Sequence, residues 1–245
     1  MPLGRAEEAR ALMVELFPSG FEEAEAGGEL ELAGYGESLR EERLRALGRV
    51  SISSVEPGWE ERWRVFHRPA VVGPLWIGPP WERPPAGAVA VTIDPGRAFG
   101  TGAHPTTRLS LELLLECEPG SLVDLGCGSG VLAVAAAKLG FAPVAALDSD
   151  DAAVEAARAN AAANRATVVV RRADVVVDPI PAADIAVANI ALPVVERVAE
   201  RVGAPLLVAS GYLAHEAPDL PGWERRGRRE ADGWAADLFG RAPGS

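Results

Sequence analysis

With 245 residues, of which 48% are hydrophobic, the chain is long enough to bury a substantial core in one large domain or two smaller ones. Its 24 basic and 35 acidic residues give a net charge of -11, which argues against a nucleic-acid binder and suits a basic protein partner. Because no apolar run approaches ~18 residues and the start, MPLGRAEEAR, lacks a signal-peptide pattern, we expect a cytoplasmic protein without membrane contact. We also expect a monomer. Cys117 and Cys127 fit no metal-ligand spacing, so no metal site is predicted.

The first third of the chain has the pattern of a small α+β domain. The apolar spacing predicts helices at 7–17 and 37–48, and alternating residues predict strands at 28–36 and 49–55. Short apolar runs at 71–73 and 75–78 predict further strands, and PPWERPPAG at 79–87 predicts a stiff linker. We therefore expect a boundary near residue 85, between domains of residues 1–85 and 86–245.

From residue 88 onward, the pattern predicts alternating strands and helices. Apolar strands are predicted at 121–126, 143–150, 166–174, 184–190 and 204–213, and helices at 131–140, 151–164 and 192–203. This order is typical of an α/β fold, in which a largely parallel sheet has helices on both faces. Since ligands on such sheets bind beyond the carboxyl ends of the strands, residues that follow strands are the candidate site residues.

The run LVDLGCGSG predicts a nucleoside site. Asp124 ends a strand, and three glycines open the next helix: Gly126, Gly128 and Gly130. The following strand ends in Asp148, whose carboxylate can accept both ribose hydroxyls. The G-x-G-x-G spacing and the acid beside the loop favour S-adenosylmethionine over NAD, because Asp124 would repel a pyrophosphate and attract a sulfonium or ammonium group. Alternatively, Asp124 complements the helix dipole and Asp148 caps the helix at 151–164.

Asn189 is the candidate catalytic residue. It ends the strand at 184–190 in the sequence VANIAL, at the rim where a reacting group would lie. Its amide oxygen can accept a hydrogen bond from an incoming amine and orient the nitrogen lone pair. The alternative is an asparagine that forms the turn after its strand.

Another glycine-rich run, IDPGRAFGTGAHPTT at 93–107, comes earlier in the chain, so it is the first run and LVDLGCGSG is the second. Together with VDLGCGSGVLAVAAAKLG, ALDSD and VANI, it resembles the PrmA family, the methyltransferases of the eleventh protein of the large ribosomal subunit. The upstream WEERWRVFHRPAVVGPLWIGPPWE is also similar, so the resemblance covers most of residues 10–215.

This resemblance implies a Rossmann-like class I methyltransferase sheet, S-adenosylmethionine as the cofactor, and a lysine or N-terminal amine of a basic ribosomal protein as the acceptor. It also implies that the run at 93–107 folds over the bound cofactor. Phe99 can then pack against the cofactor, and Thr106 and Thr107 provide hydroxyls for its methionine carboxylate. The resemblance carries cofactor contacts onto Thr107, Gly126, Asp148 and Asn189.

Some features depart from the family pattern or allow another role. MPLGRAEEAR offers no strand before the first helix, so the N-terminal domain, ferredoxin-like in the family and the part that docks the substrate, is expected to be incomplete or rearranged. AHEAPDLPG is shorter and richer in proline than the usual fifth helix. Thr106 or Thr107 can also cap the helix that follows, and His104 is expected to stabilise its own turn rather than assist proton transfer.

Other functions remain open at this point. A methyltransferase of the same fold can act on another protein lysine or on a small amine. A nicotinamide-dependent oxidoreductase also uses a glycine-rich turn, but the G-x-G-x-G spacing speaks against it.

Overall fold

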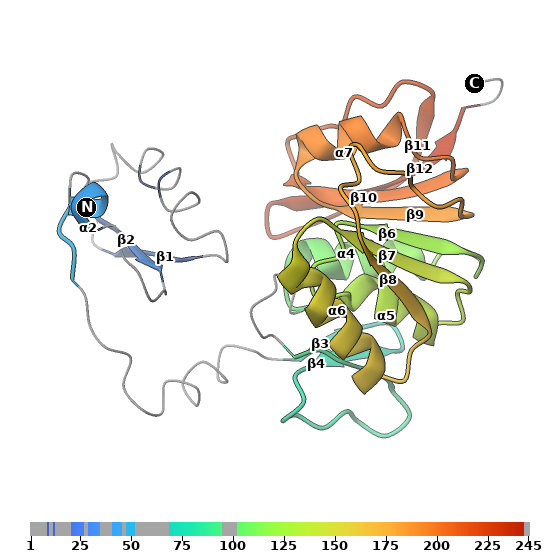
Figure 1. The fold of residues 1–245 in the computed structure, drawn as a ribbon, viewed down its shortest axis with the longest axis horizontal. Coiled ribbons are helices and arrows are strands. Elements are labelled where there is room, and N and C mark those ends of the chain that lie inside the picture. Colours follow the sequence, from blue (N-terminus) through green and yellow to red (C-terminus); the bar gives the residue numbers. More distant parts are fainter. Residues whose placement is uncertain are drawn as a thin grey trace. The chain divides into compact units, whose positions relative to one another are not determined.

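The computed structural model describes residues 9, 12, 21–26, 29–34, 41–45, 48–51, 69–94 and 102–242. The chain divides into two compact units, Met1–Arg62 and Trp63–Ser245. Each unit is considered by itself below, and Figure 1 shows the elements of both.

The smaller unit contains an antiparallel hairpin and a short helix. Strand β1 (Phe21–Ala26) pairs with β2 (Glu29–Gly34), and α2 (Glu41–Arg45) follows. Strand β2 and helix α2 fall within the segments predicted at 28–36 and 37–48, whereas β1 was not predicted. The predicted helix at 7–17 and strand at 49–55 lie largely outside the described residues, although Ala9 and Leu12 are helical and residues 49–51 are not in a strand.

A small sheet begins the described part of the larger unit. Strand β3 (Ala70–Val72) runs antiparallel to β4 (Leu75–Gly78), and β4 runs parallel to β5 (Val89–Thr92). Leu75 and Ile77 are buried in the core that also contains side chains of the larger unit's helices. The division at Arg62/Trp63 therefore differs from the expected boundary near residue 85, because the strands before that point pack into the larger unit. The predicted linker is the connection from β4 to β5.

In the described part of the chain, seven strands form the central sheet, in the order β11-β12-β10-β9-β6-β7-β8. They are β6 (Leu122–Leu125), β7 (Val144–Asp148), β8 (Val168–Arg172), β9 (Ile185–Asn189), β10 (Leu206–Leu213), β11 (Trp223–Ala231) and β12 (Trp234–Arg241). Strands β6 to β10 are parallel, and β12 is antiparallel to both of its neighbours. The five predicted strands are all present. The hairpin β11–β12 was not predicted.

Helices cover both faces of this sheet, as predicted. They are α4 (Pro105–Leu114), α5 (Val131–Lys138), α6 (Asp151–Ala163) and α7 (Leu192–Ala199). Alternate residues of a strand point to opposite faces. Leu122 of β6 accordingly joins the core under α4, α5 and α6, whereas Val123 joins the core under α7. In Figure 1, α7 lies apart from the other three helices.

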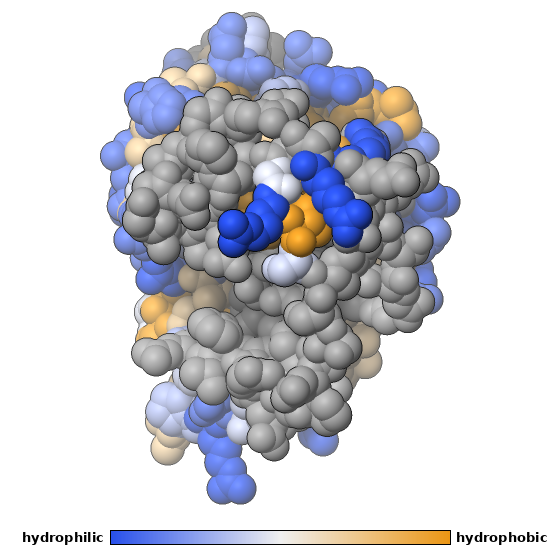
Figure 2. Space-filling view, turned by 90° about the vertical axis from the view of Figure 1, so that its left-hand side faces the viewer, coloured by the Kyte–Doolittle hydropathy of each residue, from blue (hydrophilic) through white to orange (hydrophobic). Residues whose placement is uncertain are grey.

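Among the residues that Figure 2 colours, hydrophilic ones dominate and hydrophobic ones form small separate patches. Within the described residues, each helix is too short or too polar to cross a lipid bilayer. The described His, Cys, Asp and Glu side chains form no group suited to holding a metal ion.

Candidate functional site

The second glycine-rich loop connects β6 to α5 across the end of β7. Its three glycines all have positive φ angles: 73° at Gly126, 52° at Gly128 and 79° at Gly130. The N–H groups of Gly126 and Cys127 both donate to the Leu147 carbonyl, at 2.8 and 2.9 Å. A Cβ atom on Gly126 would lie only 2.5 Å from Cγ2 of Ile190. This position therefore requires glycine for both its backbone angle and its close neighbour.

Asp124 lies buried beneath this loop, with 1% of its surface exposed. Its Oδ2 accepts a hydrogen bond from the N–H of Ala133, in the first turn of α5 (3.2 Å). Its Oδ1 has no hydrogen-bond partner within the described chain. Burial, with a contribution from the negative charge of Asp148, raises the pKa of Asp124 to about 7. One oxygen of the carboxyl thus accepts a hydrogen bond from the first turn of α5, and the other is available for a hydrogen-bond donor or a cation.

Asp148 ends β7 and faces the same loop. Its Oδ2 accepts a hydrogen bond from the N–H of Gly128 (2.9 Å), and its Oδ1 accepts one from the N–H of Asp150 (3.0 Å). The cap of α6 is Asp150, which accepts from the N–H of Ala152 (2.9 Å). Asp148 is therefore not the residue that caps this helix. A carboxylate has about four acceptor positions, so roughly two remain for a ligand.

The N-terminus of α4 lies next to the end of β9. His104 is the cap residue, rather than Thr106 or Thr107, for which capping was the alternative role, because its Nδ1 accepts from the N–H of Thr106 (3.3 Å) and α4 begins at Pro105. The Thr106 hydroxyl also contacts this nitrogen (2.7 Å). The side-chain amide of Asn189 donates to Oγ1 of the buried Thr107 (3.4 Å). The helix start and the candidate catalytic residue are thereby joined.

His104 stabilises its own turn, as expected from the sequence. Burial, together with the positive charge of Arg108, lowers its pKa, which favours the neutral imidazole that can accept at Nδ1. Its ring also packs edge-on against Trp234, with ring centroids 4.9 Å apart. Phe99 lies outside the described residues, so its contact with a cofactor stays a prediction, as do the ligand roles of the other site residues.

Asn160 links the two glycine-rich runs, Asn164 holds β5, and sequence reasoning missed both residues. Asn160 accepts from the N–H of Asp94 (3.0 Å), at the start of the first run, and donates to the carbonyl of Ser129 (2.9 Å), in the second. Asn164 bonds both backbone groups of Thr92 in β5, at 2.8 and 2.5 Å. The available signal was a pair of asparagines four residues apart in an alanine-rich helix, which lie on one face.

Comparisons with known proteins show which family the chain is similar to. A family model described as Ribosomal protein L11 methyltransferase (PrmA) matches residues 31–217. The ribosomal protein L11 methyltransferase of Caldicellulosiruptor saccharolyticus is 39% identical over 183 residues, which are 71% of this chain and 61% of the relative. That of Symbiobacterium thermophilum is 37% identical over 219 residues, which are 80% of this chain and 72% of the relative.

A solved structure, the ribosomal protein L11 methylase from Lactobacillus delbrueckii subsp. bulgaricus, matches with a TM-score of 0.63 and 27% identity. The match covers 69% of this chain and 95% of that one. The chain spans 61% of the length of the Caldicellulosiruptor relative and 72% of that of the Symbiobacterium relative.

Proposed function

The chain belongs to the PrmA family of ribosomal protein L11 methyltransferases, and from this we propose that it transfers methyl groups from S-adenosylmethionine to amines of a ribosomal protein. The acceptors are lysine side chains, the N-terminal amine, or both. Asp124 is the residue before the last of β6, and Asp148 and Asn189 are the last residues of β7 and β9, the two neighbours of β6 in the central sheet. Ligands of such sheets bind at this edge.

The observation that carries this proposal is the buried Asp124 carboxyl beneath the glycine loop. Its unpartnered Oδ1 would accept from the cationic amino group of the cofactor, which would stabilise the ionised carboxylate. Asp148 would hold the ribose hydroxyls through its remaining acceptor positions, and Gly126, Gly128 and Gly130 would leave room for the nucleoside. When bound, S-adenosylmethionine supplies an electrophilic methyl group on a positively charged sulfur.

Asn189 would orient the acceptor amine. Because its amide nitrogen donates to Thr107, its amide oxygen remains to accept a hydrogen bond at the rim. A lysine with a pKa near 10.4 is neutral in roughly one molecule in a thousand at pH 7, which costs about 4 to 5 kcal/mol. The proton can leave to water before methyl transfer, so no strong base is required, and His104 keeps its role as the cap of α4.

We also infer that the N-terminal part of the chain recognises the protein substrate. Its hairpin carries three glutamates in β1 and two in β2, and the whole chain has a net charge of -11. Such a negative field attracts a basic protein and speeds its association. We propose that this part has the α+β, ferredoxin-like arrangement of the family, and that the protein works as a monomer in the cytoplasm.

The test is methylation of purified ribosomal protein L11 by the full-length protein with labelled S-adenosylmethionine. We expect label on lysine or N-terminal amines. Asn189→Ala should lower kcat by at least about tenfold with little change in cofactor affinity, because it removes the group that orients the acceptor. Preserved kcat with weakened cofactor binding would instead make Asn189 a cofactor ligand only.

The same assay distinguishes the other candidate functions. Label that enters a small amine or another protein, but not L11, would favour the same reaction on a different substrate. Calorimetric titration with S-adenosylmethionine and NADH in parallel tests the cofactor. Binding of NADH alone would contradict the proposed reaction and favour an oxidoreductase.

A further inference from the structure

A bulge interrupts the pairing of β10 with β12 beside Asn189. The register shifts between Ser210 and Tyr212, so that Gly211 has no partner on β12. Gly211 has a φ of +101°, and a Cβ atom on it would lie 2.3 Å from the carbonyl oxygen of Ile190. Ile190 directly follows Asn189, and its N–H donates to the Ser210 carbonyl (3.1 Å). The bulge therefore lies directly against the peptide that carries the candidate catalytic residue.

Ile190 contacts the glycine loop on its other side. The Cγ2 atom that would lie 2.5 Å from a Cβ on Gly126 belongs to this side chain, while Gly211 contacts its backbone. Gly126 and Gly211 have no side chains that could change conformation, so Ile190 has little room to move between them. A displacement of the bulge should consequently be transmitted to Asn189.

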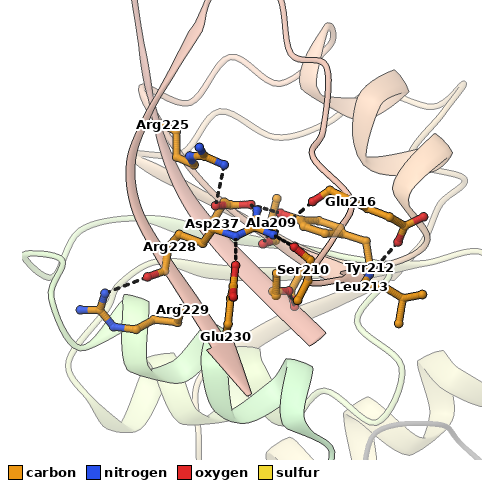
Figure 3. A network of polar contacts seen from close by, with 12 residues as sticks. Ala209, Ser210, Tyr212, Leu213, Glu216, Arg225, Arg228, Arg229, Glu230 and Asp237 are labelled. Carbon is orange, nitrogen blue, oxygen red and sulfur yellow. Dashed lines mark hydrogen bonds and ion pairs between the residues drawn. The ribbon is translucent and has the colours of Figure 1, made fainter. Parts of the chain in front are cut away.

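A buried carboxylate holds the bulge from β12 (Figure 3). Asp237 is 0% exposed, and its Oδ2 accepts hydrogen bonds from the Tyr212 hydroxyl (2.9 Å) and from the Arg228 guanidinium (2.8 Å). Arg225 lies 3.8 Å from its Oδ1. Burial and the nearby Asp237 carboxylate raise the pKa of Tyr212, so its hydroxyl keeps the proton with which it donates. The network thus fixes the residue that follows Gly211.

The Arg228 guanidinium also extends the network to the turn after β10. It donates to the carbonyls of Ala214 (2.6 Å) and Glu216 (3.1 Å), and the Glu216 carboxylate accepts from the N–H of Leu213 (2.6 Å). The segment that follows the bulge is therefore held at Tyr212 and again at Leu213, Ala214 and Glu216. A buried ion pair adds little stability over well-packed apolar side chains. Its main effect here is to impose one geometry on the bulge.

We propose that Tyr212, Asp237 and Arg228 are positioning residues for Asn189, acting through the bulge at Gly211. This inference rests on the proposed methyl transfer, in which the Asn189 amide oxygen orients the acceptor amine. Misplacement of such a group by about 1 Å can slow a reaction on the order of a hundredfold. Loss of the network should therefore reduce turnover, while Asp124 and Asp148, on β6 and β7, keep their positions.

The first measurement does not depend on activity. The side-chain amide signal of Asn189, assigned by its absence in Asn189→Ala, is followed by NMR in the whole protein. Tyr212→Phe keeps the buried ring and removes only the hydroxyl, and we expect the amide signal to shift. Ser121→Ala is the matched control, because it removes a hydroxyl that donates to the Asp184 carboxylate (2.6 Å) at the opposite end of β9. It should leave the signal unchanged.

The second measurement uses L11 and S-adenosylmethionine. We expect Tyr212→Phe to lower kcat about tenfold, with KM for the protein and Kd for the cofactor within about twofold of the parent. A role limited to stability would lower the melting temperature without this split between kcat and KM. Ser121→Ala should retain the parent kcat.

The outcomes separate the two proposals. An unchanged Asn189 signal in Tyr212→Phe would overturn the positioning role, and so would a shifted signal with an unchanged kcat. If the parent protein methylates neither L11 nor any other amine, the proposed function fails. The NMR comparison then still decides whether the network positions Asn189.

Discussion

At the residue scale, Asp148 and Asp150 offer a direct comparison, because they lie two residues apart and have different contacts. Asp148 accepts from the glycine loop, whereas Asp150 caps α6. We predict that Asp148→Ala weakens S-adenosylmethionine binding by about 1.5 to 3 kcal/mol, the usual loss for hydrogen bonds to a charged group. Asp150→Ala should instead lower stability by about 1 kcal/mol and spare the affinity. Calorimetry and thermal denaturation of both variants test this pair. If Asp148→Ala binds S-adenosylmethionine as tightly as the parent protein, Asp148 is not part of the site.

Also at the residue scale, the raised pKa of Asp124 should make both stability and cofactor affinity depend on pH. Its pKa of about 7 lies above the ordinary value of an aspartate, so the folded protein binds more protons than the unfolded chain between about pH 4 and 7. Its contribution to stability is therefore greatest at low pH and falls as pH rises through this window. A bound cation favours the ionised carboxylate, so cofactor affinity should increase as pH rises toward about 7 and then level off.

Calorimetric titrations from acid to neutral pH measure this linkage. Asp124→Asn keeps the shape of the side chain and removes its charge, so both its affinity and its stability should lose the dependence that Asp124 causes. Parallel pH profiles for the parent and the variant would contradict the linkage.

At the scale of elements, α6 fastens β5 and the first glycine-rich run to the glycine loop. Asn160→Ala removes the hydrogen bonds to the Asp94 N–H and to the Ser129 carbonyl, which together should lower stability by about 1 to 3 kcal/mol. Because Ser129 belongs to the glycine loop, cofactor affinity should fall as well. Asn164→Ala is the matched control, since it loses bonds to Thr92 and not to the loop. Denaturation and calorimetry of both variants should show similar losses of stability and a difference in affinity; an equal loss of affinity would argue against the link.

At the scale of the whole molecule, the boundary between the units decides where the chain can be cut. A protein that begins at Trp63 should fold and bind S-adenosylmethionine, but lose most of its kcat/KM for L11 if the N-terminal part docks the substrate. One that begins at Ala86 also loses β3 and β4, including the buried Leu75 and Ile77, each of which contributes roughly 1.5 to 3 kcal/mol through burial. Its melting temperature should be the lower of the two. Equal rates on L11 from the full-length protein and the one beginning at Trp63 would contradict the docking role.

The sequence by itself determined the core of the fold and the candidate residues at its edge. Continuous apolar runs such as 185–188 mark strands buried on both faces, and a strand buried in this way belongs to a parallel sheet covered by helices. The carboxyl ends of parallel strands lie at one edge, so Asp124, Asp148 and Asn189 could be grouped from their places alone. The hairpin β11–β12 escaped prediction because the exposed residues of WERRGRREA hide its alternation.

The tertiary structure decided which polar groups pair and where the units divide. Apolar periodicity shows which face of an element is buried, but it cannot show which distant backbone groups that face meets. Asn160 reaches Asp94 across 66 positions of the chain, and Tyr212 reaches Asp237 across 25. Similarly, His104 caps α4, rather than Thr106 or Thr107, because its ring lies where Nδ1 can accept from the Thr106 N–H. These pairings depend on distances of about 3 Å between elements, which exist only once the sheet and its helices have packed.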